Sequence, residues 1–284
     1  MAASGVTTHA LRPYLAAFTA RFLLMLQYRA AALAGFATQC WWGAIKVMVY
    51  AAFYAAAPAA AAQAPITLSQ AITYTWLSQA FLALLPWFVD PEIGQSVRTG
   101  AVAYDRLRPV DTYAYWYARS AGWMTARAAP RAALMFAAAG IALPLLGLAD
   151  WAWLPPPSLE AAALFTLSMV LVVLLSSALI MLINLTAAAS LDARGANAVM
   201  MPVVTVFSGS LLPLALYPDW MHTFLLAQPF AGLVDIPFRI YSGNLAGSAA
   251  WTGIALQAFW TLAFVLLGRL AMEKVMDRLQ VQGG

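Results

Sequence analysis

Few residues in this chain could do chemistry, and their spacing fits none of the common catalytic sites. Two histidines, His9 and His222, and a single cysteine, Cys40, lie far apart in 284 residues, so they suggest neither a zinc site nor a nucleophile–histidine set. Neither Lys46 nor Lys274 has the neighbouring glycines and the following Ser or Thr that a phosphate-binding loop requires. The sequence therefore indicates no metal site, no bound cofactor and no ATP hydrolysis by this chain.

Charged side chains gather instead in one short segment. The stretch AVAYDRLRPVDTY, residues 101–113, holds Asp105, Arg106, Arg108 and Asp111, although only 9% of the chain is charged. Carboxylates so close to arginines are better explained as helix caps and ion-pair partners than as catalytic acids, so a membrane enzyme is disfavoured. A connection of roughly forty residues is long for an idle loop, which favours docking to a partner.

The composition is typical of an all-α integral membrane protein. Hydrophobic residues make up 63% of the chain, and the mean hydropathy is +0.77, far from the roughly one-quarter charged residues of soluble domains. We expect one membrane domain over residues 1–284, surrounded by lipid. The net charge of +4 is spread over short loops, so it indicates membrane orientation and no nucleic-acid partner.

Six apolar stretches predict six membrane-spanning helices, because a crossing needs roughly 20 residues. They cover about 30–57, 68–89, 132–148, 159–190, 198–216 and 248–272. The segment 217–247 is broken by prolines and predicts an interfacial or re-entrant hairpin. Most Lys and Arg residues precede the first stretch, follow the last, or lie between the second and third. This bias predicts that both termini and the charged segment face the cytoplasm.

A short capped helix is predicted at the start of the charged segment. Asp90 is a good N-cap, Pro91 suits the first helical position, Glu92 favours the positive end of the helix dipole, and Gly100 is a good stop. Asp111 can cap a second helix. One face of that helix would carry Tyr113, Trp116, Tyr117, Ser120 and Met124.

Three motifs in order carry a resemblance to a known family. They are YRAA before the first span, EIGQSVRTGAVAYDRLRPVDTYAYWYAR after the second, and FSGSLLPLALYPDWM with QPFAGLVDIPFRIYSGN after the fifth. Together they resemble the permease subunits of type-2 ABC exporters, the ABC-2 family, over nearly the whole chain. In the second motif, Gly100 and the Tyr104, Leu107, Arg108 and Pro109 pattern match that family's loop.

The resemblance implies an amphipathic N-terminal helix at the cytoplasmic surface and a coupling helix between spans two and three. That helix maps to Pro91 through Thr99, buttressed by Tyr104 to Pro109, and an extracellular hairpin maps to Pro218 through Gly243. The implied ATPase-coupling residues are Pro91, Glu92, Ile93, Gln95, Ser96, Arg98, Thr99, Arg106 and Arg108. The residues expected to cap the exit path are Trp220, Phe224, Phe230 and Phe238.

The same resemblance implies partners, and the apolar and aromatic residues of the first two spans suggest a class of cargo. ATP and magnesium would be bound by a separate cytoplasmic ATPase dimer, and a second permease chain, identical or a sibling, would complete an exporter in a bacterial inner membrane. An amphipathic, lipid-like or drug-like substrate suits the apolar lining. Candidates for the substrate path are Trp41, Trp42, Lys46, Tyr50, Tyr74, Trp76 and Phe207.

An ion-coupled secondary transporter is the alternative, because such proteins place ionisable residues near the middle of the bilayer. Lys46 is the only clear candidate within a predicted span. Its position in the outer half favours snorkelling or packing between helices over a role in transport. No internal repeat supports the alternative.

Overall fold

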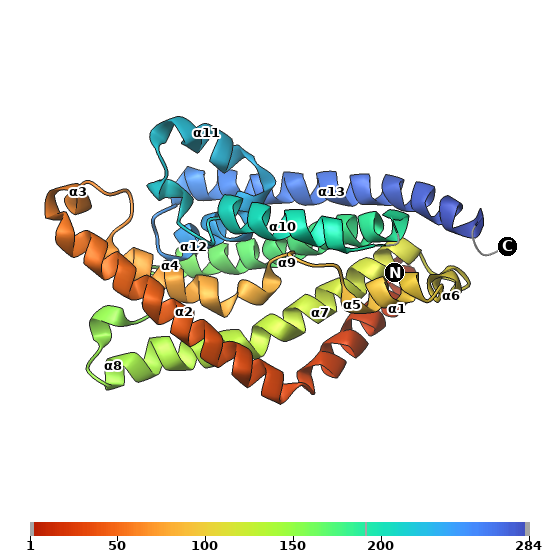
Figure 1. Cartoon of the computed structure of the whole chain (residues 1–284), viewed down its shortest axis with the longest axis horizontal. Coiled ribbons are helices and arrows are strands. Elements are labelled where there is room, and N and C mark those ends of the chain that lie inside the picture. The colour runs from red at the N-terminus through yellow and green to blue at the C-terminus, as the bar shows by residue number, and fades with distance from the viewer. Residues whose placement is uncertain (1–2, 191, 282–284) are drawn as a thin grey trace.

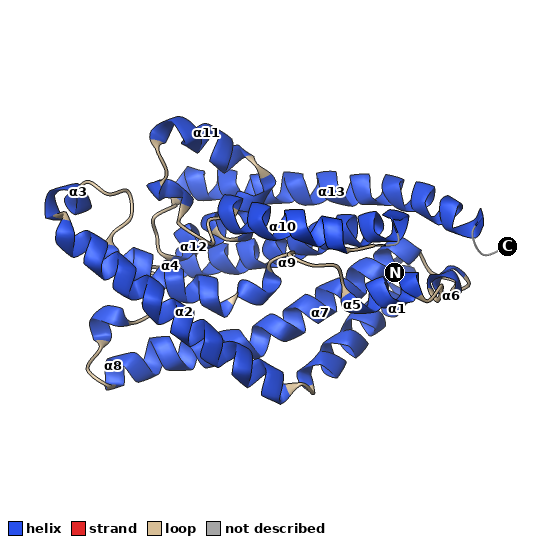
Figure 2. Ribbon diagram, in the orientation of Figure 1, coloured by secondary structure: helices blue, strands red, loops and turns tan. Residues whose placement is uncertain are grey.

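The structure of the chain, a computed structural model, describes residues 3–190 and 192–281. Side chains are described over the same ranges except residues 3–10, 103, 106 and 278–281. Within the described ranges the backbone forms helices joined by loops, and Figure 2 shows no strand there. The all-α class predicted from composition is confirmed.

The helices differ widely in length. Their bounds are α1 Ala3–Leu26, α2 Arg29–Ala56, α3 Pro58–Ala62, α4 Leu68–Ala80, α5 Pro91–Arg98, α6 Val102–Arg106, α7 Thr112–Met135, α8 Leu143–Leu145, α9 Leu159–Ser190, α10 Arg194–Phe207, α11 Asp219–Ala227, α12 Asp235–Tyr241 and α13 Gly247–Val281. A π-helical stretch, Phe136–Ala142, joins α7 to α8, and 3-10 turns form Leu82–Leu84, Ala149–Trp151, Leu214–Leu216 and Pro229–Leu233.

The long helices run side by side along the molecule (Figure 1). Helix α9 packs against α13 and α7, α1 packs along α7, and α2 packs against α4. The start of α1, the end of α13 and the short helices α5 and α6 lie at one end, while α3 and α8 lie at the other. Segments far apart in the sequence therefore meet around α5.

Three helical stretches are long and apolar enough to cross a membrane among the described residues. They are Thr112–Leu145, Leu159–Ser190 and Gly247–Asp277. The second coincides with the predicted span 159–190. The first corrects the sequence-based division, because the helix capped by Asp111 and the span predicted at 132–148 are one continuous helix. Its arginines suggested a loop, yet they fit in a helix because they face other parts of the protein.

Two predicted spans end early. The span predicted at 68–89 stops at Ala80, after which the chain makes a 3-10 turn and runs without regular structure to Asp90. The span predicted at 198–216 is α10, which starts at Arg194 and ends at Phe207. Gly209 follows with a φ of +89°, and a Cβ there would lie 2.4 Å from the Tyr74 hydroxyl. Only glycine tolerates both conditions, so the chain turns there.

The N-terminal helix forms, but the expectation that it is amphipathic is wrong. Leu11, Leu15 and Leu23 are exposed on α1, whereas Arg21 is buried. The pattern is reversed at this point because a charged residue inside the fold has carboxylate partners there.

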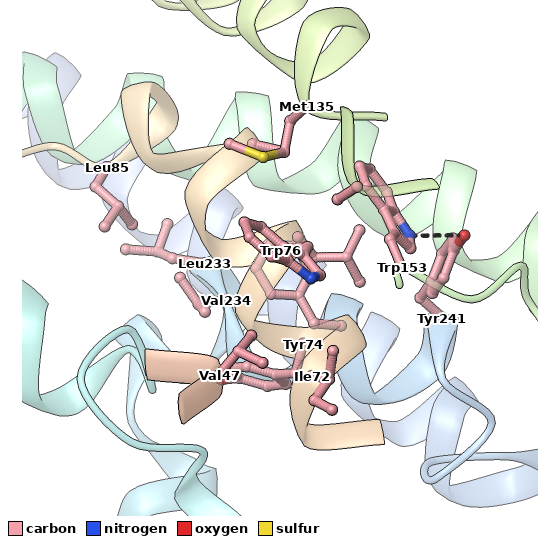
Figure 3. Packing of buried hydrophobic residues seen from close by; sticks show 14 of the residues in the cluster. Val47, Ile72, Tyr74, Trp76, Leu85, Met135, Trp153, Leu233, Val234 and Tyr241 are labelled. Carbon is pink, nitrogen blue, oxygen red and sulfur yellow. Dashed lines mark hydrogen bonds between the residues drawn. The ribbon is translucent and has the colours of Figure 1, made fainter. Parts of the chain in front are cut away.

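The main apolar core lies between α2, α4, α7, α9 and the segment around α12 (Figure 3). Val47, Tyr74 and Trp76 belong to it, and the Trp153 indole N–H donates to the Tyr241 hydroxyl at 2.9 Å. Buried tyrosine and tryptophan usually find such partners. This core fixes the part of the molecule away from α5 and leaves the α5 end to a second cluster.

Candidate functional site

Helix α5 is the two-turn helix predicted after Asp90, and its ends are capped as the sequence indicated. The Asp90 carboxylate accepts a hydrogen bond from the Glu92 N–H at 3.0 Å, satisfying a donor that the helix start leaves free. Pro91 occupies the first position, where no N–H is needed. Thr99 closes the helix, and Gly100 follows with a φ of +74°. The prediction of a capped short helix is confirmed.

Asp90 connects α5 to three other helices. Its carboxylate lies 3.3 Å from Arg21 Nη2 on α1 and accepts from the Ser120 hydroxyl on α7 at 3.1 Å. Its N–H donates to the Asn184 side-chain oxygen on α9 at 2.9 Å. Asp90 is only 1% exposed, and this burial raises the pKa of its carboxyl, while Arg21 and the Ser120 hydroxyl oppose the shift.

Glu92 extends the charged cluster. Its carboxylate pairs with Arg21 and accepts from Arg119 Nη2 of α7 at 2.5 Å. Within this cluster the Arg21–Asp90 pair is buried, and breaking a buried ion pair by removing one partner costs about 3–5 kcal/mol, because a charge is left without compensation. The cluster therefore holds α5 in one position relative to α1 and α7.

Asp105, at 8% exposure, ties the following loop to α7 in the same way. It accepts from the Trp116 indole N–H at 3.0 Å and lies 3.3 Å from Arg108 Nε. Asp111 caps α7 by accepting from the Ala114 N–H at 2.7 Å. The acids of the stretch 101–113 are thus caps and ion-pair partners, as their spacing predicted.

The inner face of α5 is apolar. Ile93 and Val97 are buried in a cluster with Trp116 of α7, Met181 of α9 and Met272 of α13. Three residues of the predicted shared face of α7, Tyr113, Trp116 and Tyr117, belong to this packing, while Met124 packs in a separate cluster. Movement of α5 must therefore shift side chains of three long helices.

The predicted coupling residues divide by exposure. Ile93 and Glu92 turn into the protein, and the Ser96 hydroxyl donates to the Ile93 carbonyl at 2.9 Å. The exposed members of the set are Pro91, Gln95, Arg98, Thr99 and Arg108. Tyr104 and Leu107 stand beside them at 71% and 79% exposure. The side chain of Arg106 lies outside the described residues.

Sequence reasoning missed the residues of the long helices that bind the start of α5. Arg21 and Arg119 were counted only as signs of membrane orientation, and Asn184 was not singled out. A signal for Asn184 existed, because its amide stands in the long apolar run of α9, where a polar residue needs a partner.

The segment from Pro218 to Gly243 is broken into α11, a 3-10 turn and α12, as its prolines predicted. Trp220 and Phe224 of α11 are exposed, and Phe230 is partly buried. The expectation of a surface position is wrong for Phe238, which is 1% exposed and packs edge-on against Tyr74 with ring centroids 5.5 Å apart.

Phe238 is buried because α12 is held inside the protein. Asp235, fully buried at the start of α12, accepts from the Leu214 N–H at 2.8 Å and lies 3.3 Å from Arg239 Nη1. The Tyr74 hydroxyl donates to the Gly209 carbonyl at 3.0 Å on the same side. The segment is therefore an exposed α11 followed by an inserted α12.

The substrate-path candidates also divide by position. Trp41 and Trp42 are exposed on α2, and Phe207 is partly buried at the end of α10. Lys46 Nζ donates to the Ser210 carbonyl at 2.6 Å, so it packs between helices. The remaining candidates, which are buried, are Tyr50, Tyr74 and Trp76.

Comparison with known proteins gives one match. Residues 44–283 match the family model described as ABC-2 family transporter protein. No curated protein and no solved structure matches the chain. Among the described residues no group of three or more His, Cys, Asp or Glu side chains could hold a metal ion.

Proposed function

The chain belongs to the ABC-2 family of transporter proteins, whose membrane permeases work with a separate ATPase, and from this premise we propose that it is the permease subunit of an exporter. It would form a single membrane domain in a bacterial inner membrane, beside an identical or sibling permease. ATP and magnesium would be bound by the partner. The observation that carries this proposal is the capped helix α5, which is ion-paired to α1 and α7 and exposes its outer face.

The exposed residues around α5 form the proposed docking surface, which comprises Pro91, Gln95, Arg98, Thr99, Tyr104, Leu107 and Arg108. Two large side chains stand out from this surface, Tyr104 and Leu107. At the end of the protein that lies in water, such side chains suit burial in a partner's cleft, where a few anchors supply most of the affinity. Arg98 and Arg108 at the rim would govern partner choice more than affinity.

Replacing Tyr104 and Leu107 by serine is expected to remove the ATPase from the permease. Truncating two anchors of one interface costs more than about 2 kcal/mol each, which lowers affinity at least about tenfold per residue. The measurement is mass spectrometry of proteins that co-purify with tagged permease. Leu145→Ser is the control, since Leu145 is 81% exposed near the other end. Equal ATPase recovery with all variants would contradict the docking surface.

Six crossings with cytoplasmic termini form the second part of the proposal. Helices α4 and α10 have 13 and 14 residues, about 20 Å at 1.5 Å per residue, and an apolar bilayer core is about 30 Å thick. The irregular chain after α4 includes the buried residues Ala83 to Pro86. Backbone of this kind is tolerated at membrane depth when protein surrounds it, which supports two crossings made of broken helices.

Cysteine labelling is expected to place the C-terminal end of α13 and the short helix α3, which follows α2, on opposite sides of the membrane. In a Cys40→Ala background, a thiol reagent that cannot cross the membrane is added from outside. Ala61→Cys should react with it in intact cells, whereas Lys274→Cys should react only after the membrane is permeabilised. Positive residues concentrated at the α5 end support this orientation. External labelling of Lys274→Cys would overturn the topology and the docking surface together.

The substrate path is proposed along α2 and the end of α10, where Trp41, Trp42 and Phe207 offer aromatic surface to an amphipathic, lipid-like or drug-like molecule. Tyr50, Tyr74 and Trp76 could line it only when the helices part. The ion-coupled alternative has weaker support, because Lys46 and Asp235 are already engaged by hydrogen bonds within the protein.

A further inference from the structure

A cavity of 870 Å³ lies where α1 turns into α2, beside the chain that leads into α5. It is lined by the end of α1, the start of α2, residues 88, 89 and 91, and the middle of α7. Most of its lining is apolar, with Leu33, Phe88 and Leu134 as examples, and Leu33 and Phe88 are exposed. In a membrane protein such a rim faces acyl chains.

Three arginines line this apolar cavity without a carboxylate partner. Arg29, Arg127 and Arg131 come from α2 and α7, and among the described residues none of them makes an ion pair. No described lining residue is acidic. Asp90, close by in the chain, is already paired with Arg21. The cavity therefore concentrates positive charge that no described carboxylate neutralises through an ion pair.

Two of the guanidinium groups are held in place by packing. Arg127 lies over the Trp123 ring, 4.7 Å from its centroid. Arg131 lies against α2 at Gly35, where a Cβ would come within 2.8 Å of its guanidinium carbon, and its Nε is buried without a hydrogen-bond partner. Arg127 and Arg131 are one helical turn apart, a spacing at which like charges repel. An anion between them would relieve this repulsion.

We propose that this cavity binds the phosphate of an anionic phospholipid, with an acyl chain along Leu33, Phe88 and Leu134. Guanidinium groups bind phosphate oxygens through paired, charge-assisted hydrogen bonds. Basic pockets between helices on the cytoplasmic side of a membrane are suited to such headgroups. A ligand with both a phosphate and a tail matches a cavity that has both a charged side and an apolar side.

Lipid binding here would also bear on α5. Val89 and Pro91 line the cavity, and they flank Asp90, the residue that fixes the start of α5. A phospholipid in the cavity would support that segment from the membrane side, so occupancy would favour the clamped position of α5. The site needs only that the chain lie in a membrane, so its test is independent of the ATPase.

Native mass spectrometry of the purified full-length chain tests the site, with phosphatidylglycerol and phosphatidylcholine of equal chain length as the two probes. The wild type is expected to bind phosphatidylglycerol more tightly than phosphatidylcholine. The Arg127→Gln, Arg131→Gln double variant should lose about tenfold in phosphatidylglycerol affinity, as expected for lost hydrogen bonds to a charged group. Its binding of phosphatidylcholine should fall less, because the quaternary ammonium of that headgroup already offsets the phosphate charge. An unchanged lipid preference in this variant would overturn the proposal.

Two further variants separate this site from general effects of charge and folding. Arg194→Gln with Lys274→Gln removes the same amount of charge from exposed positions outside the cavity and should keep the preference for phosphatidylglycerol. An equal loss of phosphatidylglycerol affinity in this variant would mean nonspecific attraction and would refute the site. Arg127→Lys with Arg131→Lys should fold and retain part of the preference. Added glycerol phosphate should not displace the lipid, and displacement at comparable concentration would show that the site binds free phosphate instead.

Discussion

Asp90→Ala is expected to abolish coupling between the permease and its ATPase while the membrane helices still insert. The substitution leaves Arg21, which is 6% exposed, without one of its two carboxylates, and it removes the N-cap of α5. Breaking such a buried pair costs about 3–5 kcal/mol, and losing a cap costs about 1 kcal/mol more. The measurements are thermal unfolding in nanodiscs and stimulated ATP hydrolysis in the reconstituted complex.

Asp90→Asn separates the two contributions of Asp90, since asparagine is also a good N-cap. It should keep the cap and the Ser120 contact but lose the charge, so most of the destabilisation should remain. Combining it with Arg21→Met should recover part of the stability, because it removes the buried Arg21 charge that has lost one of its carboxylates. Asp192→Asn, at an exposed pair with Arg194, is the control and should change little. Wild-type coupling in Asp90→Ala would mean that α5 does not depend on this cluster.

Gly122→Leu is expected to detach α1 from α7 and to lose coupling for the same reason. A Cβ at Gly122 would lie 2.5 Å from the Phe18 carbonyl oxygen, which is backbone and cannot rotate away. Overpacking of this kind costs about 1–3 kcal/mol, and displacement of α1 would also separate Arg21 from Asp90. A lowered unfolding temperature and faster hydrogen exchange in α1 are the expected measurements.

The effect of Gly122 should depend on the size of the new side chain. Gly122→Ala should lower stability less than Gly122→Leu, whereas Gly195→Ala, in an exposed part of α10 with open space around it, should be neutral or slightly stabilising. The stability losses of Gly122→Leu and Asp90→Ala should add to less than their sum, since both variants break the same contact between Arg21 and Asp90. A fully stable Gly122→Leu would show that α1 is not fixed through this site.

These contacts suggest how a displacement would be transmitted. Pressure of an ATPase on the exposed side of α5 would reach α7 and α9 through Ile93 and Val97, and α1 through Arg21. A capped helix moves as a unit, whereas an uncapped loop would deform locally. The proposed exporter cycle would therefore depend on the packing of α5 against α1, α7 and α9 as much as on the docking surface.

Local features were predictable from the sequence because they depend on neighbours in the chain. The cap at Asp90, the stop at Gly100, the helix 159–190 and the broken segment after Pro218 all follow from residue types within one or two helical turns. The assignment of the acids as caps and ion-pair partners rested on the same local spacing. For these features the sequence was sufficient.

Other features depend on residues that only the folded chain brings together. The early end of α10 depends on Tyr74 lying against Gly209. Phe238 is buried because Asp235 has partners from other segments. The long helix from Thr112 accommodates its arginines because one pairs with Glu92 and others line the cavity. Composition, hydropathy and local residue patterns were enough to identify an all-helical membrane protein of a recognisable family with a capped helix at Asp90. Which charges are neutralised within the chain could be seen only in the fold, because burial and pairing depend on neighbours that lie far apart in sequence. The fold distinguishes Arg21 and Arg119, which pair with carboxylates, from Arg29, Arg127 and Arg131, which make no ion pair among the described residues.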